Sequence, residues 1–515
     1  MKRLLVSVTI IICFNLSLYC LVSEQDTLRY SFNAVKIERT LDISGRLDDP
    51  LWQIAIPLEL QYETSPGENT PADQKTIALF LYNDDFIYIG FYCFDSIPES
   101  IRASMCDRDR IFNDDYVMVT IDTDNNSQRG YEFAVNPYGI QGDLLNTGAS
   151  GDPSYDMVWR SAAAIDSRGW TAEIAIPIKV LDFSKEEEQE WTISLLRSRP
   201  RNNKYFYSWT PIDRDNSNYL SQGVMVKNLN NIKPGNSIDI LPYIMSQQSG
   251  TKSDISDPGS VMNHSSLKTQ IGGGVTYGLG SALTLNAVIN PDFSQIESDA
   301  DQISVNTTFA LNYPEKRPFF MSGMDLIQTP MYYSRTINNP LFAIKANGKV
   351  KNLSYLALAA YDRNTAIIVP GEEQSNTIRT DLDSYAGVAR LRYDLGNENH
   401  IGILGLSRNL TDAHNYLGGV DWNLKFWKNW YFQAELFLSN TKELNDSSVF
   451  ISERQFGSTG NNAGFDGEDY FGYGMHLALS KRGKNYGFRL VQNDFSPTYQ
   501  TYNGRFPSVG FKQYA

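Results

Sequence analysis

The feature that most constrains this chain is a series of segments after Gly235, each of about ten residues, in which apolar and polar side chains alternate. Segments 422–426 and 431–438 show the pattern, and segment 471–480 shows it most clearly. On one face of segment 471–480 lie Phe471, Tyr473, Met475, Leu477 and Leu479, and on the other lie Gly472, Gly474, His476 and Ser480. Because successive side chains of a β-strand point to opposite faces, these segments predict strands with one apolar face. Both a membrane barrel and a soluble sandwich satisfy that pattern.

The lengths of the connections favour the barrel. Tight connections at 278–281, 396–399, 427–430 and 482–485 take turns with long polar ones at 249–266, 363–384 and 440–468. Short turns at one end and long loops at the other are typical of outer-membrane barrels. We therefore predict a transmembrane antiparallel β-barrel over residues 236–515, with roughly fourteen strands if one lies near Met331–Thr336. The last residues, 512–515, contain no obvious closing strand, so we expect the barrel to be incomplete at its C-terminus.

Aromatic residues at predicted strand ends, Tyr385, Tyr393, Trp427 and Trp430, fit the girdles that mark the two membrane interfaces. The alternative is that they pack in a soluble core.

The first half of the chain has a different pattern of apolar and polar residues. Between residues 35 and 229, short apolar runs separated by Gly, Pro, Asn and Asp predict an antiparallel β-sandwich. The predicted strands are 76–82, 87–94, 116–122, 131–136, 162–165 and 171–176, and residues 228–235 are predicted to be a linker. Ahead of the sandwich, Lys2 and Arg3 precede a mostly apolar run that ends at Val22. This predicts a cleaved signal peptide over residues 1–22, with a membrane-anchoring helix as the alternative.

Charge and cysteine content narrow the function classes. With 45 Lys and Arg against 59 Asp and Glu, the net charge of −14 argues against a nucleic-acid partner and favours neutral polar ligands or cations. After the signal peptide only Cys93 and Cys106 remain. We expect Cys93 to be a core residue, and a disulfide is the alternative. Because the chain has only four histidines and no Cys/His cluster, structural zinc is excluded.

One loop of the predicted sandwich is rich in side-chain oxygens. Asp122, Asp124 and Asn126 offer oxygens at alternate positions, which suits a hard cation, so they are candidate calcium ligands. A solvated turn is the plain alternative. A glycosidase needs two carboxylates across a cleft, but Asp and Glu are too abundant here for any pair to be informative. The chain also contains no nucleophile motif and no phosphate-binding loop, so we assign no catalytic residue.

Two sets of motifs resemble known families. Residues 43–52 (ISGRLDDPLW), followed by Asp114-Asp115, 121–124 (IDTD), 131–137 (YEFAVNP), Val158-Trp159 and 169–177 (GWTAEIAIP), resemble the carbohydrate-binding module family 9-like domain. Residues 290–299 (NPDFSQIESD), 313–320 (YPEKRPFF) and 333–335 (YSR) resemble the outer-membrane barrel family catalogued as domain of unknown function number 5916. Together the two resemblances span nearly the whole mature chain.

The first resemblance implies carbohydrate binding, in which paired tryptophans clasp a sugar and nearby acidic or amide groups bind its hydroxyls. Trp159 is the best match for such a platform, with core packing as an equal alternative, and Trp170 is a second candidate. Tyr138, which follows the Asn136-Pro137 turn, and the pair Asp114 and Asp115 complete the candidate sugar-binding set. Trp52 is predicted to lie in the core.

The second set of motifs contains many charges. Asp292, Glu297, Asp299, Asp301, Glu315, Lys316 and Arg317 flank predicted strands. Because such residues cannot face lipid, we expect them to fold into the lumen, as a structural plug or as a substrate constriction.

The sequence thus predicts an all-β outer-membrane protein with a periplasmic sandwich, which binds glycans in polysaccharide uptake, export or catabolism and contacts outer-membrane lipid. Two alternatives stay open. One is a hydrolase of O-glycosyl bonds with its site in the sandwich or the lumen, and the other is a structural or assembly protein of the outer membrane.

Overall fold

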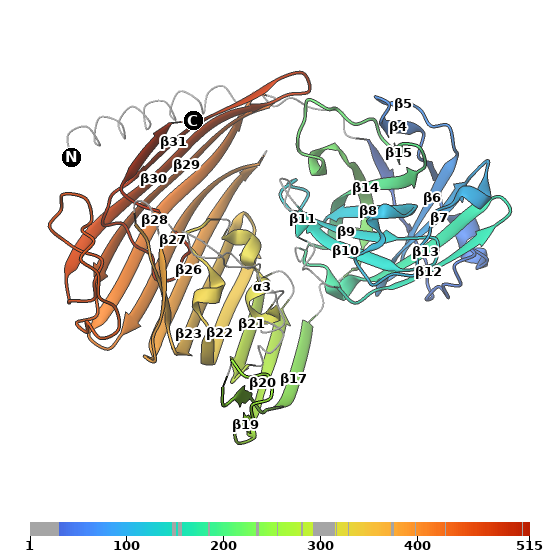
Figure 1. The fold of residues 1–515 in the computed structure, drawn as a ribbon. Coiled ribbons are helices and arrows are strands. Elements are labelled where there is room, and N and C mark those ends of the chain that lie inside the picture. The colour runs from blue at the N-terminus through green and yellow to red at the C-terminus, as the bar shows by residue number, and fades with distance from the viewer. Residues whose placement is uncertain are drawn as a thin grey trace.

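The computed structural model describes residues 30–514 apart from 147–150, 153–156, 184–185, 233–235, 255, 280–281, 292–314, 316, 328, 372–374, 397, 428 and 507. The described residues are almost entirely β-strands and connections, arranged in two parts that follow one another along the chain (Figure 1). The predicted signal peptide lies outside the described residues, as do Asp292, Glu297, Asp299, Asp301 and Lys316. Among the described residues, no helix is long and apolar enough to cross a membrane.

The first part is a β-sandwich of two sheets. Its ten-stranded sheet has the order β11 (Gly151–Asp152), β10 (Gln141–Asn146), β9 (Gly130–Val135), β8 (Tyr116–Asp122), β14 (Glu188–Pro200), β15 (Lys204–Ser208), β4 (Tyr62–Ser65) and β5 (Thr70–Pro71), with β16 (Val224–Asn230) beside β14 and β1 (Ser31–Asn33) beside β16. Its six-stranded sheet has the order β12 (Arg160–Asp166), β13 (Gly169–Pro177), β7 (Phe86–Phe94), β6 (Thr76–Tyr82) and β2 (Val35–Lys36), with β3 (Pro57–Glu59) beside β6.

The core between the two sheets explains why these short runs form strands. Ile89 and Phe91 of β7 are fully buried in one cluster with Val119 and Phe133 of the other sheet. Each such side chain contributes about 1.5–3 kcal/mol when it leaves water. The predicted linker is wrong at its start, because residues 228–230 belong to β16, whose last residue is paired with Glu188 in the register of β14.

The second part is one antiparallel sheet of twelve described strands, each paired with its neighbour in sequence. Figure 1 shows that the sheet curves like the wall of a barrel. In the strand order, β17 and β32 form its two edges. The strands are β17 (Asn236–Gln247), β20 (Lys268–Leu279), β21 (Leu283–Ile289), β22 (Asn339–Val350), β23 (Leu353–Arg363), β26 (Ser384–Gly396), β27 (Asn399–Leu410), β28 (Ala413–Phe426), β29 (Trp430–Lys442), β30 (Asp469–Arg482), β31 (Gly487–Phe495) and β32 (Phe511–Tyr514). The strand predicted near Met331–Thr336 is wrong, because this stretch folds as a turn of 3-10 helix, η7 (Ser334–Thr336), with loop before it.

The two faces of the curved sheet differ as the alternation predicts. Leu391, Ile403 and Val420 are paired across three neighbouring strands and are 47, 56 and 38 % exposed on the outer face. Tyr385 and Trp427 are also exposed, which contradicts the alternative that they pack in a soluble core. On the inner face, Arg390 lies next to Leu391 in sequence but is buried.

A short irregular segment, residues 317–337 apart from 328, covers part of the inner face (Figure 1). It contains α3 (Pro318–Met321), η6 (Met324–Leu326) and η7. Buried basic side chains of the sheet donate to its carbonyl oxygens: Lys345 to Ser322 at 2.5 Å, Arg390 to Leu326 at 2.9 Å and Arg408 to Thr336 at 3.0 Å. Arg317 of the segment pairs at 2.7 Å with Glu315, which precedes it, and both lie mostly out of solvent. These contacts favour the plug that the charged motif predicts.

Candidate functional site

The sandwich contacts the end of the curved sheet at which short turns join the strands. Lys484, in the turn between β30 and β31, donates its backbone N–H to Asp215 at 2.8 Å, and its ammonium group pairs with Glu68. The hydroxyl groups of Tyr431 and Ser217 lie 3.1 Å apart. The long loops leave the opposite end of the strands, so the sandwich covers only the short-turn end.

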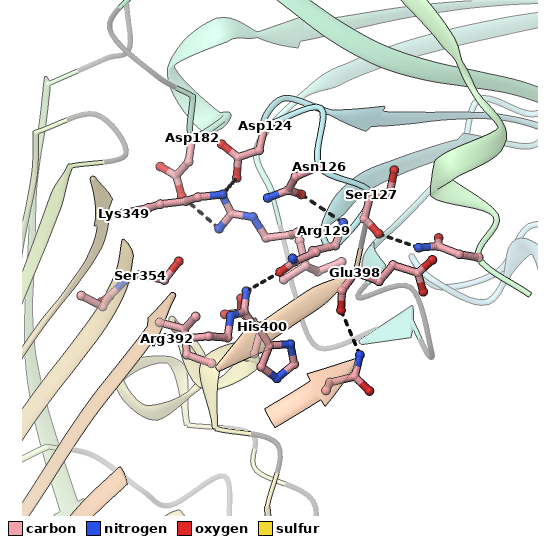
Figure 2. A pocket seen from close by; sticks show the side chains of 18 of the residues that line it. Asp124, Asn126, Ser127, Arg129, Asp182, Lys349, Ser354, Arg392, Glu398 and His400 are labelled. Atoms are coloured by element: carbon pink, nitrogen blue, oxygen red, sulfur yellow. Dashed lines mark hydrogen bonds and ion pairs between the residues drawn. The ribbon is translucent and has the colours of Figure 1, made fainter. Parts of the chain in front are cut away.

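One loop of the sandwich, residues 122–129, reaches the inner face of the curved sheet near the short-turn ends of its strands (Figure 2). We call this region the inner ends of the strands. Lys349 of β22 places its ammonium group 2.9 Å from Asp124, and 3.6 Å from Asp394 of β26. Arg392 of β26 donates to the side-chain oxygen of Gln128 at 3.1 Å. The two contacts of the loop join residues more than 200 positions apart in the sequence: 225 positions separate Asp124 from Lys349, and 264 separate Gln128 from Arg392.

The loop holds its shape through hydrogen bonds of its own. The carboxylate of Asp122 accepts the backbone N–H groups of Asp124 at 3.1 Å and Ser127 at 2.7 Å. Asn125 and Ser127 have positive φ angles of 50° and 60°, and Asn218 donates to the carbonyl of Ser127 at 2.7 Å. Burial raises the pKa of Asp122 to about 6, although the N–H of Ser127 acts in the opposite direction. A buried carboxylate that accepts local N–H groups therefore shapes the loop.

A polar cavity of about 200 Å³ lies between this loop and the inner ends of the strands. Figure 2 shows side chains from both parts of the chain converging on it. Its lining includes carboxylates, cations and amides, among them Asp124, Asn126, Arg129, Lys349, Arg392 and His400. Three amide atoms of lining residues, Nε2 of Gln128 and the Oδ1 atoms of Asn347 and Asn423, are buried without a hydrogen-bond partner in the described structure. Charges of both signs, donors and acceptors in one small cavity suit a neutral ligand with several hydroxyl groups.

The structure places the two predicted sugar-stacking tryptophans inside the sandwich. Trp159 is buried against Phe133, with ring centroids 5.3 Å apart at 83°. Trp170 is buried in the same core cluster. A sugar stacks on an exposed aromatic face, and neither of these two rings is exposed. Both residues lie in the core, which was the alternative for Trp159. Trp52 is buried as predicted, and its indole N–H donates to Glu173 at 2.7 Å.

The remaining candidates for sugar binding do not form one group. Asp114 accepts from the backbone N–H of Ser104 at 2.9 Å and from Asn136 at 3.0 Å, and Asp115 pairs with Arg201 at 2.6 Å. These buried carboxylates are engaged in holding the loop before β8. Tyr138 is 51 % exposed at the sandwich surface and, of the five, it alone offers an open ring. A sugar-binding role for these residues stays a prediction.

The candidate calcium ligands lie in a turn whose side-chain oxygens accept hydrogen bonds and an ion pair from other residues, and Asp122 is buried, not solvated. The carboxylate of Asp122 accepts hydrogen bonds from backbone N–H groups, and the side-chain oxygen of Asn126 accepts one from the N–H of Gln128 at 3.0 Å. The carboxylate of Asp124 pairs with the ammonium group of Lys349. Calcium binding at this loop stays a prediction. Cys93 is buried in the core, and Cys93 and Cys106 are both free thiols, so the disulfide alternative is wrong.

Sequence reasoning did not identify the residues that the sheet contributes to the cavity. Lys349, Arg392 and Asn423 stand at inner-face positions near the short-turn ends of their strands, and the alternation of the strands assigns them to that face. The missing information is the docking of the sandwich, because no local pattern specifies a contact between residues so far apart.

Part of the chain matches a known protein family. Residues 238–355 match the family described as a domain of unknown function, DUF5916. This stretch contains the second set of motifs, so the resemblance to that family is confirmed there. No curated protein matches the chain.

Solved structures of low sequence identity are also similar to this chain. A family 9 carbohydrate-binding module from Caldicellulosiruptor kristjanssonii, in complex with cellotriose, is 12 % identical with a TM-score of 0.30, over 40 % of this chain and 100 % of that one. OmpT, an outer-membrane protein of Vibrio cholerae, is 8 % identical with a TM-score of 0.26, over 78 % of this chain and 97 % of that one.

We expect the pair of Lys349 and Asp124 to stabilise the docked sandwich. Both side chains are mostly shielded from water, so a double-mutant cycle with alanine should give a coupling energy of about 1–3 kcal/mol. The same cycle on Lys484 and Glu68, an exposed pair at the same interface, should give roughly 0–1 kcal/mol. Urea unfolding of the sandwich within the full chain measures both. Equal couplings would show that the loop is not held against the sheet by this contact.

Proposed function

We propose that this chain is an outer-membrane protein whose sandwich lies in the periplasm and binds glycans at the mouth of the barrel. The observation that carries the proposal is the polar cavity between loop 122–129 of the sandwich and the inner ends of the strands. A ligand held there touches both parts of the chain at once. Its binding would therefore connect recognition by the sandwich with passage along the inner face, in polysaccharide uptake, export or catabolism.

The outer face of the sheet supports the membrane position. Large apolar side chains such as Leu391, Ile403 and Val420 are exposed side by side on it, whereas a soluble protein rarely leaves so many together in water. In outer-membrane barrels the short turns face the periplasm and the long loops face outward. Because the sandwich docks on the short-turn end, the same rule supports a periplasmic position for it.

The chemistry of the cavity supports a neutral polyhydroxylated ligand. Cations are matched by nearby carboxylates, as Lys349 is by Asp124 and Asp394, so the cavity has no large excess of either sign to attract a highly charged ligand. Amides of Gln128, Asn347 and Asn423 offer both donors and acceptors. The resemblance of the sandwich motifs to the family 9-like domain points to the same ligand class.

The hydrolase alternative gains no specific support from the inner face. Asp421 and Glu435 are paired in register on β28 and β29, which is the kind of carboxylate pair that a glycosidase uses. Arg390 donates to Asp421 at 2.9 Å, however, and Thr329 donates to Glu435 at 3.3 Å. Both carboxylates therefore already accept hydrogen bonds from neighbouring side chains.

A glycan array probed with the detergent-solubilised full chain tests the proposal. We expect binding to at least one oligosaccharide class, and calorimetric titration with that oligosaccharide then measures its affinity. Asn347→Ala and Asn423→Ala each remove hydrogen-bonding capacity from the cavity, so each should weaken binding by about 1–3 kcal/mol.

Tyr138→Ala is the matched control, because this residue is a sugar-binding candidate on the sandwich surface away from the cavity lining. It should leave the affinity unchanged. Loss of binding in Tyr138→Ala, with full binding in both asparagine variants, would move the site to the sandwich surface. Absence of binding to every glycan would favour a structural role.

A further inference from the structure

The long connection between β29 and β30, residues 443–468, folds back on itself at the end of the sheet opposite the sandwich. Its two arms are joined by backbone hydrogen bonds from Glu443 to Glu468 at 2.9 Å and from Asp446 to Phe465 at 3.0 Å. Beneath them lies an apolar cluster that includes Leu444, Phe456, Phe465, Tyr470 and Tyr502. Backbone hydrogen bonds and apolar packing therefore fix the positions of the two arms.

This pairing brings three carboxylates together. Oxygen atoms of Glu443, Asp466 and Glu468 lie within 4.8 Å of one another. Glu443 is 1 % exposed, and none of the three forms an ion pair with any described residue. Three like charges at this separation repel one another unless a positive charge lies between them or one of the carboxylates takes up a proton.

A second observation comes from buried polar atoms at the same place. The hydroxyl of Tyr470 donates to Oε1 of Glu443 at 2.5 Å, but Oε2 of Glu443 has no hydrogen-bond partner although it is buried. The hydroxyl of Tyr502, on a fully buried side chain that interacts electrostatically with Glu443, also has no partner in the described structure. Buried oxygens of this kind normally have a hydrogen-bond partner or a bound ion, so we expect a further group to interact with them.

We propose that Glu443, Asp466 and Glu468 bind a hard divalent cation of the calcium class. Carboxylate oxygens are the ligands that Ca²⁺ prefers, and Oε2 of Glu443 supplies a buried, unused one. The cation joins the first residue of the connection to its last residues and thereby locks the two arms. The site is independent of glycan binding at the opposite end of the sheet.

Terbium luminescence in the detergent-solubilised full chain tests the proposal, because Tyr470 lies in contact with Glu443 and can sensitise a bound Tb³⁺ ion. We expect tyrosine-sensitised emission that Ca²⁺ displaces, with a dissociation constant for Ca²⁺ on the order of 10⁻⁴ M. Limited proteolysis gives the second readout: Ca²⁺ should slow cleavage between residues 446 and 461 by about tenfold.

Glu443→Gln and Glu468→Gln keep the side-chain shape and remove one charge each, so both should fold and both should lose the emission and the protection. Glu453→Gln is the matched control, since Glu453 is exposed in the same connection. It should behave as the wild type. The proposal is wrong if the wild type gives no displaceable emission at millimolar Ca²⁺, or if Glu443→Gln retains both effects. Either result would identify Glu443 as a buried neutral acid.

Discussion

Replacing Asp95 by asparagine is expected to lower the free energy of unfolding of the sandwich by about 3–5 kcal/mol. The Asp95 side chain is fully buried and lies 2.8 Å from Arg199, 2.9 Å from Arg201 and 3.5 Å from Arg197. Arg197 is itself fully buried and has no other carboxylate within reach in the described structure. The substitution leaves this guanidinium group buried without a counter-charge. A buried charge without a partner is strongly destabilising.

The dependence of this effect on pH has a defined sign. Burial by itself raises the pKa of Asp95, but hydrogen bonds from Arg199 and the neighbouring positive charges outweigh it and lower the pKa below its ordinary value of 3.8. A lowered pKa stabilises the fold above the ordinary value, and the contribution is lost as the pH falls through the lowered pKa. Acidification should therefore destabilise the wild type more than Asp95→Asn.

Asp166→Asn is the control for Asp95→Asn. Asp166 pairs with Arg168 at 3.2 Å, but both side chains are largely exposed, so its loss should cost roughly 0–1 kcal/mol. Urea titration of the full chain in detergent, followed by fluorescence of the buried sandwich residues Trp170 and Trp191, measures both variants. Equal midpoints would mean that the arginine cluster around Asp95 contributes little to the fold.

Replacing Ile403 by arginine is expected to cost about 2–4 kcal/mol of folding free energy in lipid vesicles. Ile403 lies in the middle of β27, on the outer face, 56 % exposed between Leu391 and Val420. If this face borders hydrocarbon, the arginine carries its charge close to the bilayer midplane. The fraction of heat-modifiable folded protein at each urea concentration measures the cost.

Ile165→Arg is the matched control, because it makes the same substitution at an exposed isoleucine of the sandwich. Ile165 is 43 % exposed on β12, and a substitution at a water-facing site usually changes stability by less than about 0.5 kcal/mol. A similar small effect of both substitutions would show that the outer face of the sheet meets water and not lipid.

The second half of the fold could be predicted in detail because its pattern is local. Alternation assigned Phe471 and Tyr473 to the outer face, where both are exposed, and it placed the strands between short turns and long loops correctly. The failure at Met331–Thr336 has a physical reason. This stretch is folded against the inner face by donors such as Arg408, so its apolar residues are buried by tertiary contacts and not by strand pairing.

The site could be predicted only in part. A tryptophan such as Trp159 is large enough for either a core or a platform, and only the packing of Phe133 and its neighbours decides between them. Asp124 was singled out for its oxygens, but its partner proved to be the ammonium group of Lys349 on the other part of the chain. Such a contact depends on how two folded parts meet, and neither sequence segment carries that information alone.

Epitope labelling in cells tests the central claim, an outer-membrane wall with a periplasmic sandwich, most directly. One epitope is inserted after Gly259, in the exposed turn of the long loop between β17 and β20, and another after Ser167, in the turn between β12 and β13. We expect antibody to bind the first epitope on intact cells and the second only after the outer membrane is permeabilised. Labelling of the Ser167 epitope on intact cells, or recovery of the full chain as a soluble periplasmic protein, would contradict the account.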